Sequence, residues 1–292
     1  MKKETLNKFS NKIYSQFGED GILTEILKRL DKKNHDNWCV EFGARDGVSD
    51  SNTLNLIKNH NYKAVLIEGD KKYYKKLCQN FPQNEITKIN KFINFTGENN
   101  LDNTLKNTKI PKNFDFLSID IDGCDYYIFE SLTEFRPKII CIEFNHLIPN
   151  SVEFIQNKDF SIKQGCSAKS LIQLGKIKNY EVVASSHCNL FFVDKSYFEF
   201  ILKETISIDD LIDDSEIKNF IFCGYDGSFH TTKPLRLGWH KIDIDNEKIQ
   251  PLPSYIRCFP DDYNLFQKII FYLYREVLSP GRFIKKFLSR KK

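Results

Sequence analysis

The chain has 292 residues, of which 41% are hydrophobic, and its formal net charge is only +4. This length accommodates one α/β domain with an extension, at roughly 100–200 residues per domain, and the small net charge gives no case for nucleic-acid binding. The eight cysteines form no C-x-x-C pair, which argues against both a disulfide framework and a zinc site.

The N-terminal segment, Met1 to Lys12, is polar and lacks the apolar stretch of a signal peptide. No apolar run further along approaches the roughly 20 residues that a membrane span needs, so we expect a cytoplasmic protein. Apolar residues recur at a helical period between Gly18 and Leu30. We therefore expect residues 1–35 to form an N-terminal helical cap region.

Short apolar runs follow, and most of the segments between them are long enough for helices. This alternation predicts an α/β fold with a parallel sheet and right-handed crossovers, and the last two apolar runs are close enough to form an antiparallel pair. A helix is predicted at Ala168–Ile177. The strands are predicted at Trp38–Phe42, Ala64–Ile67, Glu85–Ile89, Phe114–Ile121, Lys138–Phe144, Tyr180–Ala184 and Leu190–Val193.

The first strand leads into a turn that suits a nucleotide-like cofactor. Glu41 lies near the strand end, and Gly43 and Gly47 let the backbone approach a ligand closely. The second strand leads to Glu68, which is placed to accept both hydroxyls of a ribose. A dinucleotide site needs G-x-G-x-x-G, whereas this loop is G-x-x-x-G behind an acid that would repel a pyrophosphate. Glu41 suits the cationic end of S-adenosylmethionine, although a tight turn of any α/β protein remains the alternative.

Acidic residues also end the fourth and fifth predicted strands. Asp120 and Asp122 lie two apart, on one face of a strand, and Glu143 is followed by Asn145 and His146. Ligands of open α/β sheets bind outside the carboxyl ends of the strands, so we predict that the two aspartates line the reaction site. Oxygen ligands from adjacent strand ends suit Mg²⁺ or another divalent cation, here held by Asp120, Asp122, Glu143 and Asn145.

Each of these acids also has a purely structural interpretation. Asp120 or Asp122 would serve as a cap of the following helix. Glu143 would pair with an arginine, and His146 would be an exposed loop residue.

Together these segments resemble the FkbM-like S-adenosylmethionine-dependent methyltransferases, many of which are O-methyltransferases that modify sugars or natural products. The strand order also matches that of class I methyltransferases. This match implies a Rossmann-like sheet of seven strands, mostly parallel with the last strand antiparallel, and with helices on both faces. The resemblance covers about two thirds of the chain, from Tyr14 to Val193. The motifs that carry it are Ser15–Asp20, the loop after Glu41, Glu68, Ser118–Tyr126 and Ile142–Asn145.

The resemblance implies which residues bind the cofactor. It places the segment Phe95–Asn99, with Thr96 and Asn99, near the adenine. The sequence departs from the family at Arg45–Asp46, where a small residue and Asn are common, and at Cys124, where Asn is common. Cofactor roles are implied for Gln16, Glu19, Glu41, Gly43, Glu68 and Asp120.

The predicted function is an O-methyltransferase that acts on a sugar hydroxyl or glycan precursor in surface polysaccharide biosynthesis. A sugar hydroxyl is a weak acid, so a general base or a cation would help; Asp122 is the first candidate base and His146 the second. The alternatives are methylation of a nitrogen or a phosphoryl oxygen in the same pathway, and a non-catalytic cofactor-binding module of glycan assembly. A nicotinamide oxidoreductase is disfavoured because the loop lacks the second glycine.

We expect a methyltransferase domain over residues 1–194 and a helical and loop-rich extension over 195–292, with Lys195–Phe222 helical. The last eleven residues carry six basic and no acidic side chains, interleaved with apolar ones. Such a tail can lie on an anionic membrane, which would place the enzyme at the inner membrane face. The alternative is a solvated or frayed helix. The sequence sets no oligomeric state.

Overall fold

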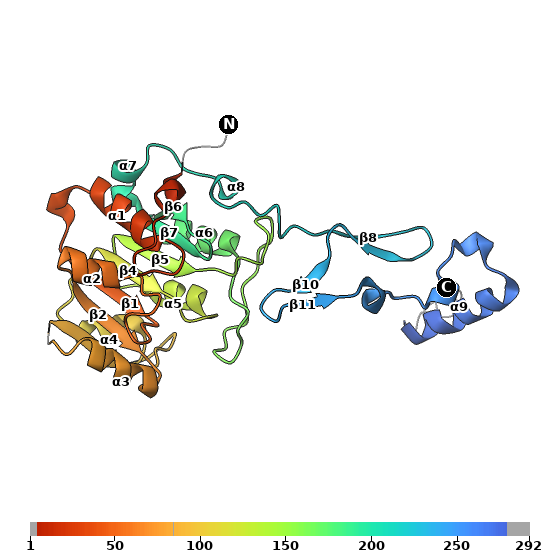
Figure 1. Cartoon of the computed structure of the whole chain (residues 1–292), viewed down its shortest axis with the longest axis horizontal. Coiled ribbons are helices and arrows are strands. Elements are labelled where there is room, and N and C mark those ends of the chain that lie inside the picture. The colour runs from red at the N-terminus through yellow and green to blue at the C-terminus, as the bar shows by residue number, and fades with distance from the viewer. Residues whose placement is uncertain (1–4, 84, 279–292) are drawn as a thin grey trace, which may run out of the picture. The chain divides into compact units, whose positions relative to one another are not determined.

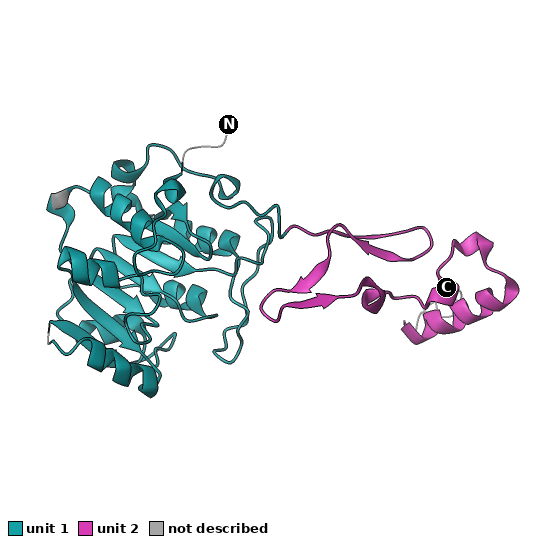
Figure 2. Ribbon diagram, viewed as in Figure 1, with its two compact units in different colours: residues 1–217 teal, residues 218–292 magenta. Residues whose placement is uncertain are grey.

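The computed structural model describes residues 5–83 and 85–278 (Figure 1). The chain divides into two compact units, Met1–Ile217 and Lys218–Lys292 (Figure 2), and each is described by itself. In the first unit seven strands form one sheet in the order β3-β2-β1-β4-β5-β7-β6. β7 is antiparallel to both β5 and β6, and the other neighbours are parallel. The predicted seven-stranded sheet with an antiparallel last strand is therefore confirmed.

The elements of the first unit lie close to the ranges that the apolar patterns predict. The strands are β1 (Trp38–Phe42), β2 (Lys63–Glu68), β3 (Ile86–Asn90), β4 (Phe116–Ile119), β5 (Ile139–Glu143), β6 (Tyr180–Ser185) and β7 (Asn189–Asp194). The helices are α1 (Glu19–Arg29), α2 (Leu54–His60), α3 (Lys71–Asn80), α4 (Leu101–Lys106), α5 (Asp125–Ser131), α6 (Ala168–Ile177), α7 (Phe198–Ile201) and α8 (Ile208–Leu211). Three short 3-10 helices lie at Leu6–Phe9, Lys32–Asn34 and Lys195–Tyr197.

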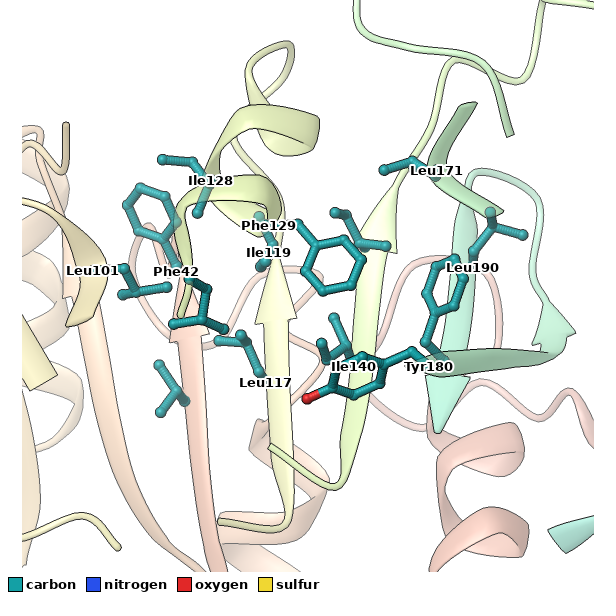
Figure 3. Close-up of a cluster of buried hydrophobic side chains, with 14 of the residues drawn as sticks. Phe42, Leu101, Leu117, Ile119, Ile128, Phe129, Ile140, Leu171, Tyr180 and Leu190 are labelled. Carbon is teal, nitrogen blue, oxygen red and sulfur yellow. The ribbon is translucent and has the colours of Figure 1, made fainter. Parts of the chain in front are cut away.

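The central strands are buried on both faces, which explains why they read as continuous apolar runs. Figure 3 shows one cluster, in which Phe42, Leu117 and Ile140 of neighbouring strands meet Ile128 and Phe129 of α5. Successive side chains of a strand alternate between faces, so the intervening residues form a second cluster against α1, α2 and α3. Its members include Cys39, Phe116, Cys141 and Phe191 of the strands, and Ile22, Leu54 and Leu77 of the helices.

The segment after β7 belongs to the first compact unit, which extends to Ile217. Arg29 Nη1 donates to the carbonyl oxygen of Ile201 at 2.9 Å, and Asn7 Nδ2 donates to that of Leu211 at 2.8 Å. The prediction of a helix over Lys195–Phe222 is wrong, because this range holds the 3-10 helix Lys195–Tyr197, the short helices α7 and α8 and the start of strand β8 (Ile221–Cys223). Backbone carbonyls that a continuous helix would use bond instead to side chains elsewhere in the unit.

The second unit consists of two β-hairpins and a helix. β8 (Ile221–Cys223) pairs with β9 (Phe229–Thr231), and β10 (Leu235–Leu237) pairs with β11 (Ile242–Ile244). Three 3-10 helices, at Asn246–Ile249, Ser254–Ile256 and Pro260–Asp262, lead to α9 (Leu265–Leu278). In the described part of the chain, none of the helices has the length and apolar character that crossing a membrane requires. The predicted basic tail, residues 282–292, lies outside the described residues.

Candidate active site

Three polar residues at the carboxyl edge of the sheet lie side by side on neighbouring strands. Glu143 of β5 is directly opposite Asn189 of β7. Ser118 of β4 is level with Cys141 of β5, so the residues two further along, Asp120 and Glu143, are level as well. Because residues two apart share a face, Asp120, Glu143 and Asn189 project from the face that α1 covers.

The structure brings together three of the four residues predicted to hold a metal. Single carboxylate oxygens of Asp120, Asp122 and Glu143 all lie within 4.8 Å of one another. Asp122 is exposed and adopts a left-handed backbone with φ of 56°. Asp125 fixes this turn, since its carboxylate accepts hydrogen bonds from the amides of Ile121 and Gly123, both at 2.9 Å.

The crowding of carboxylates changes how they titrate. Burial, then the charges of Asp125 and Asp122, raise the pKa of Asp120 to about 7. Burial, then the charges of Asp120 and Asp125, raise the pKa of Glu143 to about 9. The site therefore retains protons at neutral pH that a bound cation would displace.

The other two residues after β5 are engaged elsewhere. Asn145 donates from Nδ2 to the carbonyl oxygen of Gln164 at 2.9 Å, and its Oδ1 accepts from the amide of Leu147 at 3.0 Å. The ring centroid of His146 lies 4.3 Å from that of His187, in the β6–β7 turn. Burial and the neighbouring His187 lower the pKa of His146, which favours the neutral imidazole.

Hydrogen bonds to the carboxylate of Glu41 hold the segment that follows the glycine loop. The buried carboxylate of Glu41 accepts from Ser51 Oγ at 2.6 Å, from the amide of Asn52 at 2.8 Å and from Thr53 Oγ1 at 2.7 Å. These contacts fold the chain after the loop back onto the end of β1. The same carboxylate was predicted to face the cofactor, and in the structure both of its oxygens have partners.

Both loop glycines have left-handed backbones, with φ of 87° at Gly43 and 73° at Gly47. A Cβ on Gly43 would meet the carbonyl oxygen of Asp120 at 1.8 Å, and one on Gly47 would meet side-chain atoms of Leu77 and Phe81 at 2.6 Å. The loop therefore lies directly against the end of β4.

Glu68 ends β2 beside this loop. Its Oε2 accepts from the amide of Arg45 at 2.7 Å and its Oε1 from the amide of Asp70 at 2.6 Å. Each carboxylate oxygen can accept a further hydrogen bond, as ribose hydroxyls would require. The ring of Phe92, which is 77% exposed, lies against Gly69. The sequence analysis did not name Phe92 as a candidate residue of the cofactor site, although an aromatic residue soon after the end of β3 could have indicated it.

The remaining predicted cofactor residues lie at two separate places. Glu19 begins α1 and accepts from the amide of Phe17 at 2.8 Å, from Ser186 Oγ at 2.5 Å and from Asn189 Nδ2 at 3.1 Å. Its neighbour Gln16 is exposed.

Thr96 and Asn99 are exposed in the turn after β3. Phe95 anchors that turn by stacking on Phe160, with ring centroids 4.3 Å apart.

Residues 98–162, which include Asp120, Asp122 and Glu143, match the family model described as the methyltransferase FkbM domain. No curated protein matches the chain. One similar solved structure is a glycopeptide N-methyltransferase complexed with (S)-adenosyl-L-methionine, at 8% identity over 58% of this chain and 84% of that one, with a TM-score of 0.34. A SAM-dependent methyltransferase from Aquifex aeolicus matches at 10% identity over 64% and 94%, with a TM-score of 0.37. The N-methyltransferase NodS from Bradyrhizobium japonicum WM9 matches at 10% identity over 59% and 93%, with a TM-score of 0.35.

Proposed function

We propose that this chain, as an FkbM-like S-adenosylmethionine-dependent methyltransferase, transfers a methyl group to a sugar hydroxyl in surface polysaccharide biosynthesis. The observation that carries the proposal is the cluster of Asp120, Asp122 and Glu143, beside a glycine loop at the carboxyl edge of the sheet. Sugar hydroxyls are poor nucleophiles, and such a cluster offers both a base and a cation site for activating them.

The cofactor lies along this edge in the proposed complex, with its ribose at Glu68 and its adenine near Phe92 and the turn that holds Thr96 and Asn99. Leu66 of β2 is level with Glu41 of β1, so Glu68 is level with Gly43, which has no side chain. Glu68 and Asp120 would flank the sulfonium, and Gly43 would leave room for it between them. The surrounding carboxylates favour the positive charges of the sulfonium and the amino group.

The proposed reaction is an in-line displacement at the methyl carbon. The acceptor oxygen is held about 3 Å from that carbon, and its proton passes to the exposed carboxylate of Asp122. A carbon–oxygen bond forms as the carbon–sulfur bond breaks, which leaves S-adenosylhomocysteine. His146 is the second candidate base, because its lowered pKa keeps the imidazole able to accept a proton.

A divalent cation such as Mg²⁺ is part of the proposal. The donor set fits a hard cation, because three carboxylates lie together, and burial followed by mutual repulsion raises the pKa of two of them. Such a cation would lower the pKa of a bound hydroxyl. Asp120 and Glu143 would hold it, and Asp122 would contact it from the exposed side.

We also propose a cytoplasmic enzyme that touches an anionic membrane through its C-terminal segment. One face of α9 packs within the second unit, where Tyr274 Oη donates to the carbonyl oxygen of Pro251 at 2.9 Å. The outer face is apolar, with Phe266 70%, Leu273 65% and Val277 75% exposed. The basic sequence after α9 adds the charge that anionic lipid attracts.

Two measurements test the methyltransferase proposal. Calorimetry should detect binding of S-adenosylhomocysteine and not of NAD; failure to bind the former would overturn the proposal. Asp122→Asn should then abolish methyl transfer to a sugar acceptor while S-adenosylhomocysteine binding stays within about threefold, because Asn tolerates the left-handed backbone of this position. Full turnover of this variant would remove Asp122 as the base.

A further inference from the structure

We propose that Asn189, at the start of β7, supplies a neutral oxygen ligand to the cation site of Asp120, Asp122 and Glu143. The inference rests on the proposed function for the cation. Asn189 is only 4% exposed, yet its Oδ1 has no hydrogen-bond partner. Buried polar atoms are rarely left unpaired, so this oxygen indicates a partner that the protein does not itself provide.

The orientation of the Asn189 amide is fixed by Glu19. Asn189 Nδ2 donates to Glu19 Oε1 at 3.1 Å, and the same carboxylate oxygen accepts from Ser186 Oγ. An ionised carboxylate only accepts hydrogen bonds, so turning the amide over would bring two oxygens together. Oδ1 therefore faces away from Glu19.

The register of the sheet places this oxygen beside the carboxylates. Asn189 lies directly opposite Glu143, and side chains of such cross-strand pairs have Cβ atoms roughly 4.5–5.5 Å apart on the same face. Asp120, directly after β4, continues the same row. The free oxygen thus neighbours a carboxylate of which one oxygen lies within 4.8 Å of one oxygen each of Asp120 and Asp122.

An amide oxygen completes this donor set without adding charge. Three crowded carboxylates already repel one another, and a fourth would raise that repulsion further. Mg²⁺ and Mn²⁺ readily accept a mixture of carboxylate and amide oxygens. We assign the amide ligand to Asn189 and not to Asn145, whose oxygen and nitrogen are both used within its own loop.

Electron paramagnetic resonance of free Mn²⁺ tests the assignment on the full chain. Asn189→Ala should weaken Mn²⁺ binding by about tenfold or more, in the range seen when metal sites lose supporting groups. The matched control, Asn145→Ala, should stay within about twofold of the wild type. Wild-type affinity in Asn189→Ala, or an equal loss in both variants, would overturn the inference.

A second variant covers the case in which Asn189→Ala does not fold. The double variant Glu19→Gln with Asn189→Asp reverses the hydrogen bond between these residues and keeps an oxygen at position 189. Its affinity for Mn²⁺ should be at least about one third of the wild-type affinity. Loss of Mn²⁺ binding in the folded variant would contradict the proposal. Binding of S-adenosylhomocysteine by the wild type without any Mn²⁺ binding would refute the cation site alone, and the methyltransferase proposal would stand.

Discussion

Replacing Glu143 with glutamine tests the electrostatics of the site without any ligand. Burial and the charges of Asp120 and Asp125 raise the pKa of Glu143 from 4.5 to about 9 in the cation-free protein. A group with a higher pKa in the folded state contributes full stability below its unfolded pKa and loses that contribution as the pH rises towards its folded pKa. The wild type should therefore become less stable between pH 6 and pH 8, where only the unfolded state ionises this carboxyl.

The size of the effect follows from the two pKa values. Over these two pH units the loss has an upper limit of about 2.7 kcal/mol, at about 1.36 kcal/mol for each unit. Glu143 is partly exposed to water, which weakens its interactions, so we expect about half of that limit, roughly 1–1.5 kcal/mol. Glutamine carries no charge at either pH, and Glu143→Gln should lack this part of the pH dependence.

Urea unfolding followed by circular dichroism, with a chelator present, measures the free energy of unfolding at both pH values. The control is Glu98→Gln, which removes an exposed carboxylate outside the cluster of Asp120, Asp122 and Glu143 and should keep the wild-type pH dependence. Titrations of groups remote from this cluster cancel when the variants are compared, and the removal of the Glu143 charge acts on Asp120 and Asp125 as part of the measured difference. The reasoning fails if the wild type and Glu143→Gln show the same pH dependence, or if the wild type gains stability from pH 6 to pH 8 relative to the variant.

Three further predictions follow from other parts of the molecule. Phe92→Ala should weaken binding of S-adenosylhomocysteine about tenfold by calorimetry, because base stacking on an aromatic ring is worth about 1–3 kcal/mol; unchanged affinity would remove Phe92 from the adenine site. Gly43→Ala should lower the free energy of unfolding by about 2 kcal/mol or more, since its Cβ would meet the carbonyl oxygen of Asp120 at 1.8 Å; a neutral effect in urea unfolding would show that the loop can shift. Leu273→Asp, or deletion of residues 279–292, should reduce sedimentation with vesicles that contain anionic lipid and leave S-adenosylhomocysteine binding intact; wild-type sedimentation in both variants would contradict membrane contact.

The sheet could be predicted from the sequence because its central strands are buried on both faces and therefore read as continuous apolar runs. Trp38–Phe42 and Ala168–Ile177 begin and end where the patterns predict. The prediction of a helix over Lys195–Phe222 was wrong because of contacts that the sequence pattern does not show. The residues of this range make long-range contacts, such as the carboxylate of Asp214 with the amide of Asn150 at 2.8 Å, and local propensity does not reveal these.

The convergence of Asp120, Asp122 and Glu143 was predictable, because the carboxyl ends of adjacent parallel strands meet at one edge. The place of Asn189 beside this cluster was not predictable. Its position opposite Glu143 depends on β7 lying between β5 and β6, and no local pattern encodes that insertion. The hydrogen bonds that the carboxylate of Glu41 accepts from Ser51, Asn52 and Thr53 were also not predictable from the sequence, since they depend on the path of the loop.

The insertion of β7 between β5 and β6 also governs the order in which the site can be assembled during synthesis. When the ribosome has delivered β5 and β6 but not β7, the strand β5 has no neighbour on one side, and its backbone groups form an open sheet edge. Such edges invite pairing with other chains. Pairing of β7 with β5 therefore covers this open edge, and with it the aggregation-prone surface, in the same step that brings Asn189 opposite Glu143. If Asn189 is the proposed cation ligand, closing the sheet also completes the cation site, so protection from misassembly and completion of that site would coincide.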